Sequence, residues 1–236
     1  MVNHLFEEYE NNHFKKIQGW ANPQIFNSFR IFESIQSKNN ISGDIAEIGV
    51  HHGKFFFILD SLRKEDEISV AVDIFGDQFI NIDRSGKGDL TIFKENIKLL
   101  GREKKRIIIH QGDSTVMSSK DFLTFSKNNG YKYFSVDGGH TVEHIVNDLD
   151  IASKVIVNGG VVILDDFYNV LWPGVTEGFY KYMNTMNRNL APFAYHGNKL
   201  FITTISYHPI YLDCYYSSIK EKYNNFVIPK KAVMSM

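Results

Sequence analysis

The chain has 236 residues, 43% of them hydrophobic and 22% charged, which suits one α/β domain with additions or at most two small domains. A net charge of −1 without a long basic run argues against a nucleic-acid or membrane partner. The single cysteine, Cys214, excludes an intramolecular disulfide and a zinc site built from cysteines. Because the N-terminal segment lacks a signal-peptide pattern and no apolar run could span a bilayer, we expect a cytoplasmic protein.

Short apolar runs alternate with amphipathic ones from residue 43 onward, which predicts a parallel sheet with helices on both faces. We expect strands at 44–50, 68–74, 106–112, 131–137 and 160–166, and helices at 54–64, 90–100, 117–129 and 141–154. The basic cluster at 102–106 is interpreted as a solvated turn. A helix near 175–187 precedes two strand-like runs, 191–197 and 199–206, and their close spacing around Gly197-Asn198 predicts a hairpin.

The regions outside this pattern are interpreted as extensions of one domain. Asn22-Pro23 predicts the start of a helix in residues 1–40, a helical N-terminal extension, and 41–206 form the main domain. Residues 207–236 are expected to be a tail that packs on the domain or on a partner subunit in a possible homo-oligomer. The segment 75–88 is longer than most connections, so it is either a lid or a plain surface loop.

Acidic residues stand at or beside the end of each of the first five predicted strands: Glu47, Asp73, Asp113, Asp137 and the pair Asp165-Asp166. One such acid is most simply a helix cap or a turn residue. Five in succession indicate a ligand site, because open α/β sheets bind ligands at the carboxyl ends of their strands.

The turn after the first strand reads Glu47-Ile48-Gly49-Val50-His51-His52-Gly53. His51 stands where the dinucleotide fingerprint needs its second glycine, so a pyrophosphate could not approach the backbone closely. A ligand with a ribose, an adenine and a positive charge fits better, and S-adenosylmethionine is such a ligand.

The cofactor roles follow from position along the sheet edge. Gly49 and Gly53 would let the amino-acid end of the cofactor lie close to the turn, and Asp73 would accept both ribose hydroxyls. Asp113 and Ser114 are expected beside the adenine edge. Glu47 either fixes the loop or contacts the ammonium group of the cofactor through water.

A second group of acids follows the fourth and fifth strands. Asp137, Asp165 and Asp166 are expected to converge, and a divalent cation with oxygen ligands, Mg²⁺ by expectation, would relieve their repulsion. The alternative is that one acid caps a helix and the pair lies in a solvated turn. His140 or Asp137 could accept the proton of a hydroxyl substrate, and the sequence does not separate them.

Further along the same predicted helix, His144 and Asp148 are expected on its solvated or interfacial side. Trp172-Pro173-Gly174 is placed to form an apolar wall for a sugar or aromatic ring.

Five segments, GDIAEIGVHHGKFFFIL, VDIF, HQGDS, VDGGH and GGVVILDDF, resemble class I S-adenosylmethionine-dependent methyltransferases in their order and spacing. Over residues 41–205 the chain is most similar to metal-dependent O-methyltransferases of the macrocin and aminocoumarin-sugar type, chiefly through D-G-x-H and G-G-x-x-x-L-D-D. The resemblance implies a Rossmann-like, doubly wound and mostly parallel seven-stranded sheet with its last strand antiparallel. It also implies that Asp137, Asp165 and Asp166 hold the divalent metal.

We therefore predict an S-adenosylmethionine-dependent, metal-assisted O-methyltransferase that acts on a hydroxyl of a small molecule, a sugar or glycosylated metabolite by expectation. One alternative keeps the fold and the metal but hydroxylates its substrate, and another only binds the cofactor. A third is a zinc hydrolase using His140, Glu143 and His144, which match H-x-x-E-H. Because His140 follows a Gly138-Gly139 turn and so would start its helix, we interpret that match as accidental.

Overall fold

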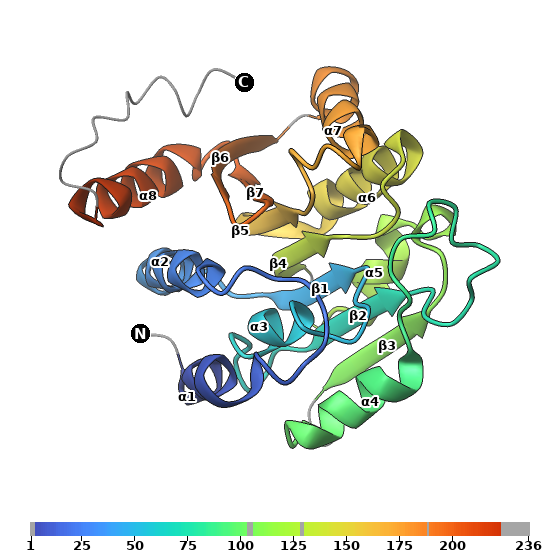
Figure 1. Cartoon of the computed structure of the whole chain (residues 1–236). Helices are drawn as coiled ribbons and strands as arrows, with labels where there is room; N and C mark the ends of the chain where they lie inside the picture. Colours follow the sequence, from blue (N-terminus) through green and yellow to red (C-terminus); the bar gives the residue numbers. More distant parts are fainter. Residues whose placement is uncertain (1–2, 103–105, 128–129, 188, 223–236) are drawn as a thin grey trace.

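The computed structural model describes residues 3–102, 106–127, 130–187 and 189–222. Its centre is a seven-stranded sheet in the order β3-β2-β1-β4-β5-β7-β6 (Figure 1). The strands are β1 (Asp44–Ile48), β2 (Ser69–Asp73), β3 (Ile107–Gln111), β4 (Tyr131–Val136), β5 (Ile156–Leu164), β6 (Leu190–His196) and β7 (Lys199–Thr204). Strands β1 to β5 pair in parallel, and β7 is antiparallel to both β5 and β6. The predicted sheet, with its last strand antiparallel, is confirmed.

Helices cover both faces of this sheet (Figure 1). One face carries α1 (His4–Glu8), η1 (Tyr9–His13), α2 (Ile25–Lys38), α3 (Phe56–Asp60), α4 (Leu90–Leu99) and α8 (His208–Lys222). The other carries η2 (Ser114–Val116), α5 (Ser119–Phe125), α6 (Val142–Val155) and α7 (Pro173–Thr185). No helix in the described ranges combines the length and the apolarity needed to cross a membrane.

Several element boundaries differ from those expected. Strand β5 begins at Ile156, before the glycine pair, because Gly159 adopts a positive φ of 81° and continues the strand where a Cβ would meet Ile41. The helix expected at 117–129 is shorter, because Ser118 and Asp121 form a capping box that starts α5 at Ser119, and α5 ends at Phe125. Residues 128–129 lie outside the described part, as do residues 223–236 of the tail, whose preceding residues form α8.

The hairpin predicted at Gly197-Asn198 is present between β6 and β7. Both turn residues have positive φ angles, 61° and 72°, which a tight two-residue connection between antiparallel strands requires. The turn therefore brings the start of β7 to the carboxyl end of β5.

Arg102 is not part of a solvated turn, which corrects the interpretation of the basic cluster. Its side chain is 3% exposed, and its guanidinium donates to Asp60 Oδ2 at 2.7 Å. Because α3 carries Asp60 into the core, this carboxylate needs a buried cationic partner. Residues 103–105 of the cluster lie outside the described part.

Asp148 lies inside the protein, so of the two positions expected on α6, solvated or interfacial, it takes the interfacial one. It is fully buried beneath η2, where Oδ2 accepts a hydrogen bond from Ser114 Oγ at 3.2 Å and Oδ1 accepts one from Asn147 at 3.0 Å. Burial raises the pKa of Asp148 to about 7, although the two hydrogen bonds oppose this shift.

A cluster of aromatic rings joins α2, the β6–β7 hairpin and α8. Phe32 on α2 is fully buried and meets Phe193, Phe201 and Tyr211 edge to face, with centroid distances of 5.4, 4.9 and 5.8 Å. This cluster fixes α2 and α8 against the antiparallel edge of the sheet.

Replacing Phe32 by alanine should lower the free energy of unfolding by about 3–5 kcal/mol, because the ring is fully buried among other rings. Leu99→Ala on α4, where the side chain is 53% exposed, is the control and should cost less than about 1 kcal/mol. Urea denaturation measures both. A loss for Phe32→Ala no larger than that for Leu99→Ala would contradict the role of the cluster.

Asp148 should make stability fall as pH rises. The unfolded chain holds this carboxyl near its ordinary pKa of about 4, whereas the folded protein holds it at about 7. Between these values the folded state binds more protons, so unfolding becomes easier with rising pH, and the full penalty, at most about 4 kcal/mol, is present above pH 7.

Asp148→Asn removes the titration and keeps the shape. Denaturation of both proteins at pH 5 and pH 8 should show that the variant loses less stability than the wild type over this interval. Equal losses in the two proteins would contradict the raised pKa.

Candidate functional site

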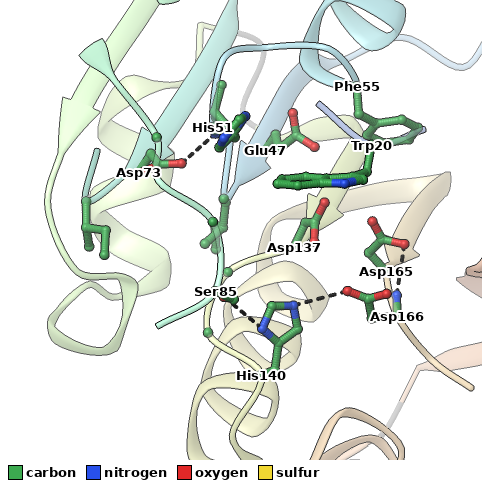
Figure 2. A pocket seen from close by; sticks show the side chains of 18 of the residues that line it. Trp20, Glu47, His51, Phe55, Asp73, Ser85, Asp137, His140, Asp165 and Asp166 are labelled. Atoms are coloured by element: carbon green, nitrogen blue, oxygen red, sulfur yellow. Dashed lines mark hydrogen bonds and ion pairs between the residues drawn. The ribbon is translucent and has the colours of Figure 1, made fainter. Parts of the chain in front are cut away.

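A cavity of about 580 Å³ opens at the carboxyl ends of the central strands (Figure 2). This volume is typical of small-molecule sites. Most of the predicted site residues line it, namely Glu47, Gly49, Asp73, Asp113, Ser114, Asp137, His140, Asp165 and Asp166. Gly53 is not among the lining residues.

The two glycines of the first turn are required by close packing. Gly49 has a φ of 86°, and a Cβ there would lie 1.7 Å from the carbonyl oxygen of Asp137. Gly53 has a φ of 92°, and a Cβ there would lie 2.4 Å from the ring of Phe57. Gly49 thus lets the end of β1 touch the end of β4, whereas Gly53 lets the turn pack on α3.

Asp73 ends β2 and faces the cavity. Its Oδ2 accepts a hydrogen bond from the His51 N–H at 2.6 Å, and its Oδ1 accepts one from the Phe75 N–H at 2.5 Å (Figure 2). Burial raises the pKa of Asp73, and the backbone donors oppose this shift. Each oxygen keeps a second lone pair, so this fixed carboxylate is able to accept hydrogen bonds from a diol.

Asp113 and Ser114 follow β3 on the same side of the cavity. Asp113 caps η2, because its Oδ1 accepts hydrogen bonds from Thr115 N and Oγ1, both at 2.8 Å. The Ser114 hydroxyl is turned toward Asp148, so its placement depends on the buried acid described above.

Glu47 has one engaged and one unpaired oxygen. The residue is 1% exposed, Oε1 accepts a hydrogen bond from Ser135 Oγ at 3.1 Å, and Oε2 has no hydrogen-bond partner within the described residues. Burial raises the pKa of Glu47 to about 8, and nearby Lys199 opposes this shift. The geometry is compatible with both predicted roles, since Ser135 fixes the residue while Oε2 is available to a cationic ligand.

Lys199 is a site residue that the sequence did not reveal. It is 1% exposed, its Nζ forms an ion pair with Asp165 Oδ2, and it lies 3.8 Å from Asp137 Oδ2 and 4.0 Å from the centre of the Phe55 ring. Burial alone would lower the pKa of Lys199, but the acids raise it above its ordinary value. Burial and Asp165 raise the pKa of Asp137 far above its ordinary value, against the effect of Lys199.

His140 lies between two carboxylates from different segments. Its Nε2 is 3.2 Å from Asp166 Oδ2, and its Nδ1 is 2.7 Å from Asp83 Oδ2 in the segment after β2. Burial alone would lower the pKa of His140, but Asp166 and Asp83 raise it to about 9. Asp166 in turn accepts hydrogen bonds from Asn169 and Asn198 through Oδ1.

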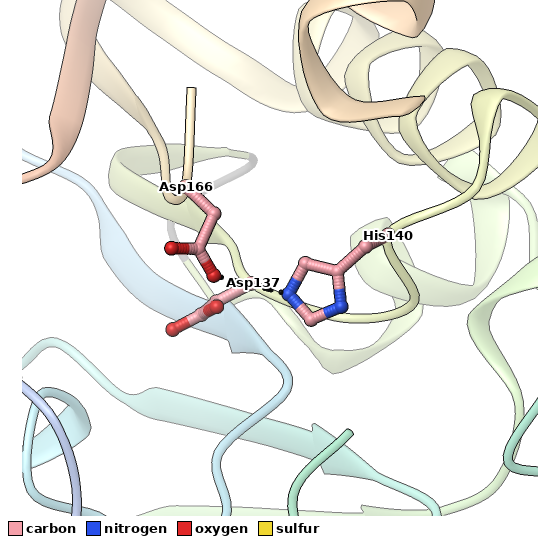
Figure 3. A group of neighbouring side chains, drawn as sticks. All are labelled: Asp137, His140 and Asp166. Carbon is pink, nitrogen blue, oxygen red and sulfur yellow. Dashed lines mark ion pairs between the residues drawn. The ribbon is translucent and has the colours of Figure 1, made fainter. Parts of the chain in front are cut away.

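The predicted metal ligands are brought together only in part. In the described part of the chain, donor atoms of Asp137, His140 and Asp166 lie within 4.8 Å of one another (Figure 3). Asp165 is engaged by Lys199 and by the Asp166 N–H at 2.8 Å. The structure thus adds His140 to the predicted acids and leaves Asp165 outside the group.

The H-x-x-E-H match does not form a metal group of its own. Helix α6 begins at Val142, so His140 lies before it, and His144 Nδ1 is 2.8 Å from the Thr141 hydroxyl. Glu143 is exposed. Among the described residues, neither Glu143 nor His144 belongs to a group with metal-ligand spacing.

Aromatic and loop residues form the walls. Trp172 stacks on the His140 ring, with centroids 4.4 Å apart and planes at 16°, while Trp20 lines the cavity and is 74% exposed (Figure 2). Ile80, Ile82 and Asp83 of the segment 75–88 also line the cavity. Asp83 could have been suspected from the length of its segment, whereas nothing in the sequence around Trp20 marks it.

Comparison with known proteins identifies the domain family and the fold. Residues 46–167, more than half of the chain, match a family model described as a methyltransferase domain. No curated protein matches the sequence. Many solved structures share the fold.

Three solved structures illustrate the fold. The O-methyltransferase NovP is 16% identical with a TM-score of 0.60, over 75% of this chain and 79% of NovP. The calicheamicin methyltransferase CalS11 is 18% identical with a TM-score of 0.58, over 84% of each chain. The mycinamycin-pathway methyltransferase MycE, solved with Mg and SAH, is 16% identical with a TM-score of 0.56, over 85% of this chain and 54% of MycE.

The family model begins within β1 and extends through β5, so it includes the turns that carry Gly49, Asp73, Asp137 and Asp165. The chain shares its fold with NovP and CalS11, and it belongs to this methyltransferase-domain family.

Proposed function

We propose that this methyltransferase transfers the methyl group of S-adenosylmethionine to a hydroxyl oxygen of a small molecule, a sugar or a glycosylated metabolite. The observation that carries the proposal is one cavity that joins the Glu47–Asp73 edge to the group of Asp137, His140 and Asp166. The names of similar structures support the acceptor class, since NovP is an O-methyltransferase and CalS11 is described as a TDP-rhamnose 3'-O-methyltransferase.

The cofactor is proposed to lie along β1, β2 and β3. Asp73 would accept the ribose hydroxyls through the lone pairs that His51 and Phe75 leave available. The unpaired Oε2 of Glu47 suits the ammonium group of the cofactor, because a buried carboxylate oxygen needs a donor. Asp113 and Ser114 would border the adenine.

The residues of the chain mainly position the two reactants in line, because methyl transfer from a sulfonium is a direct displacement. The acceptor hydroxyl must lose a proton, and His140 and Asp137 both border the cavity where it would lie. An imidazole and a carboxylate can each accept that proton, although a pKa of about 9 means that His140 must first lose its own. The choice between them stays open.

A divalent metal ion is proposed beside these groups. Its predicted ligands Asp137 and Asp166 have donor atoms at suitable separations, whereas Asp165 would first have to leave Lys199. A bound ion would lower the pKa of the acceptor hydroxyl. Mg²⁺ is the ion predicted from the carboxylate oxygens, and MycE was solved with Mg.

The mouth of the cavity suits an acceptor with an apolar face. Trp20, Ile80 and Ile82 line it and are 74%, 41% and 68% exposed. The C–H face of a sugar ring or an apolar aglycone would cover such side chains and remove apolar surface from water.

The test of the proposed function is product analysis. The protein is incubated with S-adenosylmethionine, Mg²⁺ and a panel of nucleotide sugars and glycosylated metabolites, and products are identified by mass spectrometry. A gain of one methylene unit, lost in Asp137→Asn, would support O-methylation. A gain of one oxygen atom would instead point to a hydroxylase on the same fold.

Asp73→Asn should weaken binding of S-adenosylhomocysteine by about 10- to 100-fold, because hydrogen bonds to a charged acceptor contribute about 1.5–3 kcal/mol. Asp150→Asn is the matched control, since Asp150 pairs with Lys154 on α6 away from the cavity lining. Isothermal titration calorimetry measures both. Unchanged affinity in Asp73→Asn would refute the ribose role of this residue.

Trp20→Ala should raise the KM for the acceptor by about 5- to 50-fold. Fully burying an aromatic face contributes a few kcal/mol, and the indole of Trp20, at an exposed position, would contribute only part of that. The affinity for S-adenosylhomocysteine should stay unchanged, and Trp20→Phe should restore most of the acceptor binding. Steady-state kinetics measure the KM of each variant for the acceptor. If Trp20→Ala weakened only the binding of the cofactor, Trp20 would lie at the cofactor end of the cavity and its proposed contact with the acceptor would be wrong.

A further inference from the structure

The nitrogen of one imidazole points into the acidic group at the carboxyl ends of β4 and β5. His140 Nε2 is shielded from solvent and makes no hydrogen bond of good geometry within the described residues, although it lies 3.2 Å from Asp166 Oδ2. The His140 side chain is 9% exposed. The ring edge faces Asp137 and Asp166 (Figure 3). A buried nitrogen directed at two carboxylates at this separation has the placement of a metal ligand.

The opposite edge of the ring is held in the way that metal-binding histidines are held. Nδ1 lies 2.7 Å from Asp83 Oδ2, which also accepts a hydrogen bond from the His140 N–H at 2.7 Å. When Asp83 accepts the Nδ1 proton, the lone pair of Nε2 is left for a cation. Trp172 stacks on the ring and fixes its plane.

The third predicted acid is withdrawn from the group by Lys199. The ammonium of Lys199 pairs with Asp165 Oδ2, and the Asp166 N–H donates a hydrogen bond to Asp165 Oδ1. Asp165 therefore already has a cationic partner and a backbone donor. The donor set that remains is one imidazole nitrogen and two carboxylates.

From these contacts we infer that Asp137, His140 and Asp166 form a nitrogen-containing site for a divalent first-row transition ion such as Co²⁺, Fe²⁺ or Zn²⁺, with Asp83 as the positioning residue of His140. Mg²⁺ strongly prefers oxygen ligands, whereas imidazole favours the transition ions. The inference rests on the proposed metal assistance. It replaces Asp165 by His140 among the predicted ligands and Mg²⁺ by a transition ion.

Binding of Co²⁺ to the untagged, chelator-stripped full chain provides the test, because Co²⁺ held by protein ligands shows a visible absorption band. We expect a band that saturates at one equivalent and persists in a hundredfold excess of Mg²⁺. His140→Asn and Asp83→Asn should each weaken Co²⁺ binding by about 10- to 100-fold and leave Mg²⁺ binding nearly unchanged. His144→Asn, one helical turn further on, is the matched control and should bind Co²⁺ as the wild type does.

Thermal denaturation in EDTA shows whether each variant is folded. If Mg²⁺ displaces Co²⁺ at similar concentrations and His140→Asn binds Co²⁺ normally, the ligands are oxygens alone and the inference is wrong. If neither ion binds, metal assistance itself fails. Calorimetry with S-adenosylhomocysteine on the same preparations then shows whether the methyltransferase part of the proposal still holds.

Discussion

The organisation of the site depends on one buried ammonium group. Strands β1, β4 and β5 each have a carboxylate next to their last residue, namely Glu47, Asp137 and Asp165. Lys199 of β7 lies near all three with 1% of its surface exposed. A buried acid without a partner would be strongly destabilising, so the cation offsets charge that the sheet edge could not otherwise hold. Strand β7 is thus more than the antiparallel edge of the sheet, because it supplies the charge that lets the acids come together.

A backbone contact sets the separation of the two halves of the cavity. Gly49, at the end of β1, touches the carbonyl of Asp137 at the end of β4, where no side chain would fit. The proposed cofactor half and the polar group around Asp137 are therefore spaced by main-chain packing. Such spacing changes little with side-chain motion, and in-line methyl transfer is sensitive to displacements of about 1 Å.

Patterns of apolar residues were enough to predict the parallel sheet and the Gly197-Asn198 hairpin, because these depend on local periodicity and turn chemistry. The seven strands with the last one antiparallel were implied by the family resemblance. Acids at strand ends were enough to locate the cavity. Three of the charged residues that proved to be buried, Arg102, Asp148 and Lys199, could not be predicted to be so.

Each of these three is buried because of a partner that is distant in sequence, namely Asp60, Ser114 and Asp165. Residue type alone assigns such side chains to the surface, and only the packed fold shows the pairing. The same holds for His140, whose contact with Asp83 depends on how the segment 75–88 folds back over the sheet edge.

That contact links access to the cavity with the polar group inside it. Residues of the segment 75–88 line the cavity, and Asp83 binds both the ring and the backbone N–H of His140. Any movement that opens this wall must therefore break the hydrogen bonds that orient His140. Since the ring also faces Asp137 and Asp166, the wall is closed in the same arrangement in which these three side chains are correctly placed. A long connection for which the sequence left both a lid and a plain surface loop open is in this way part of the site.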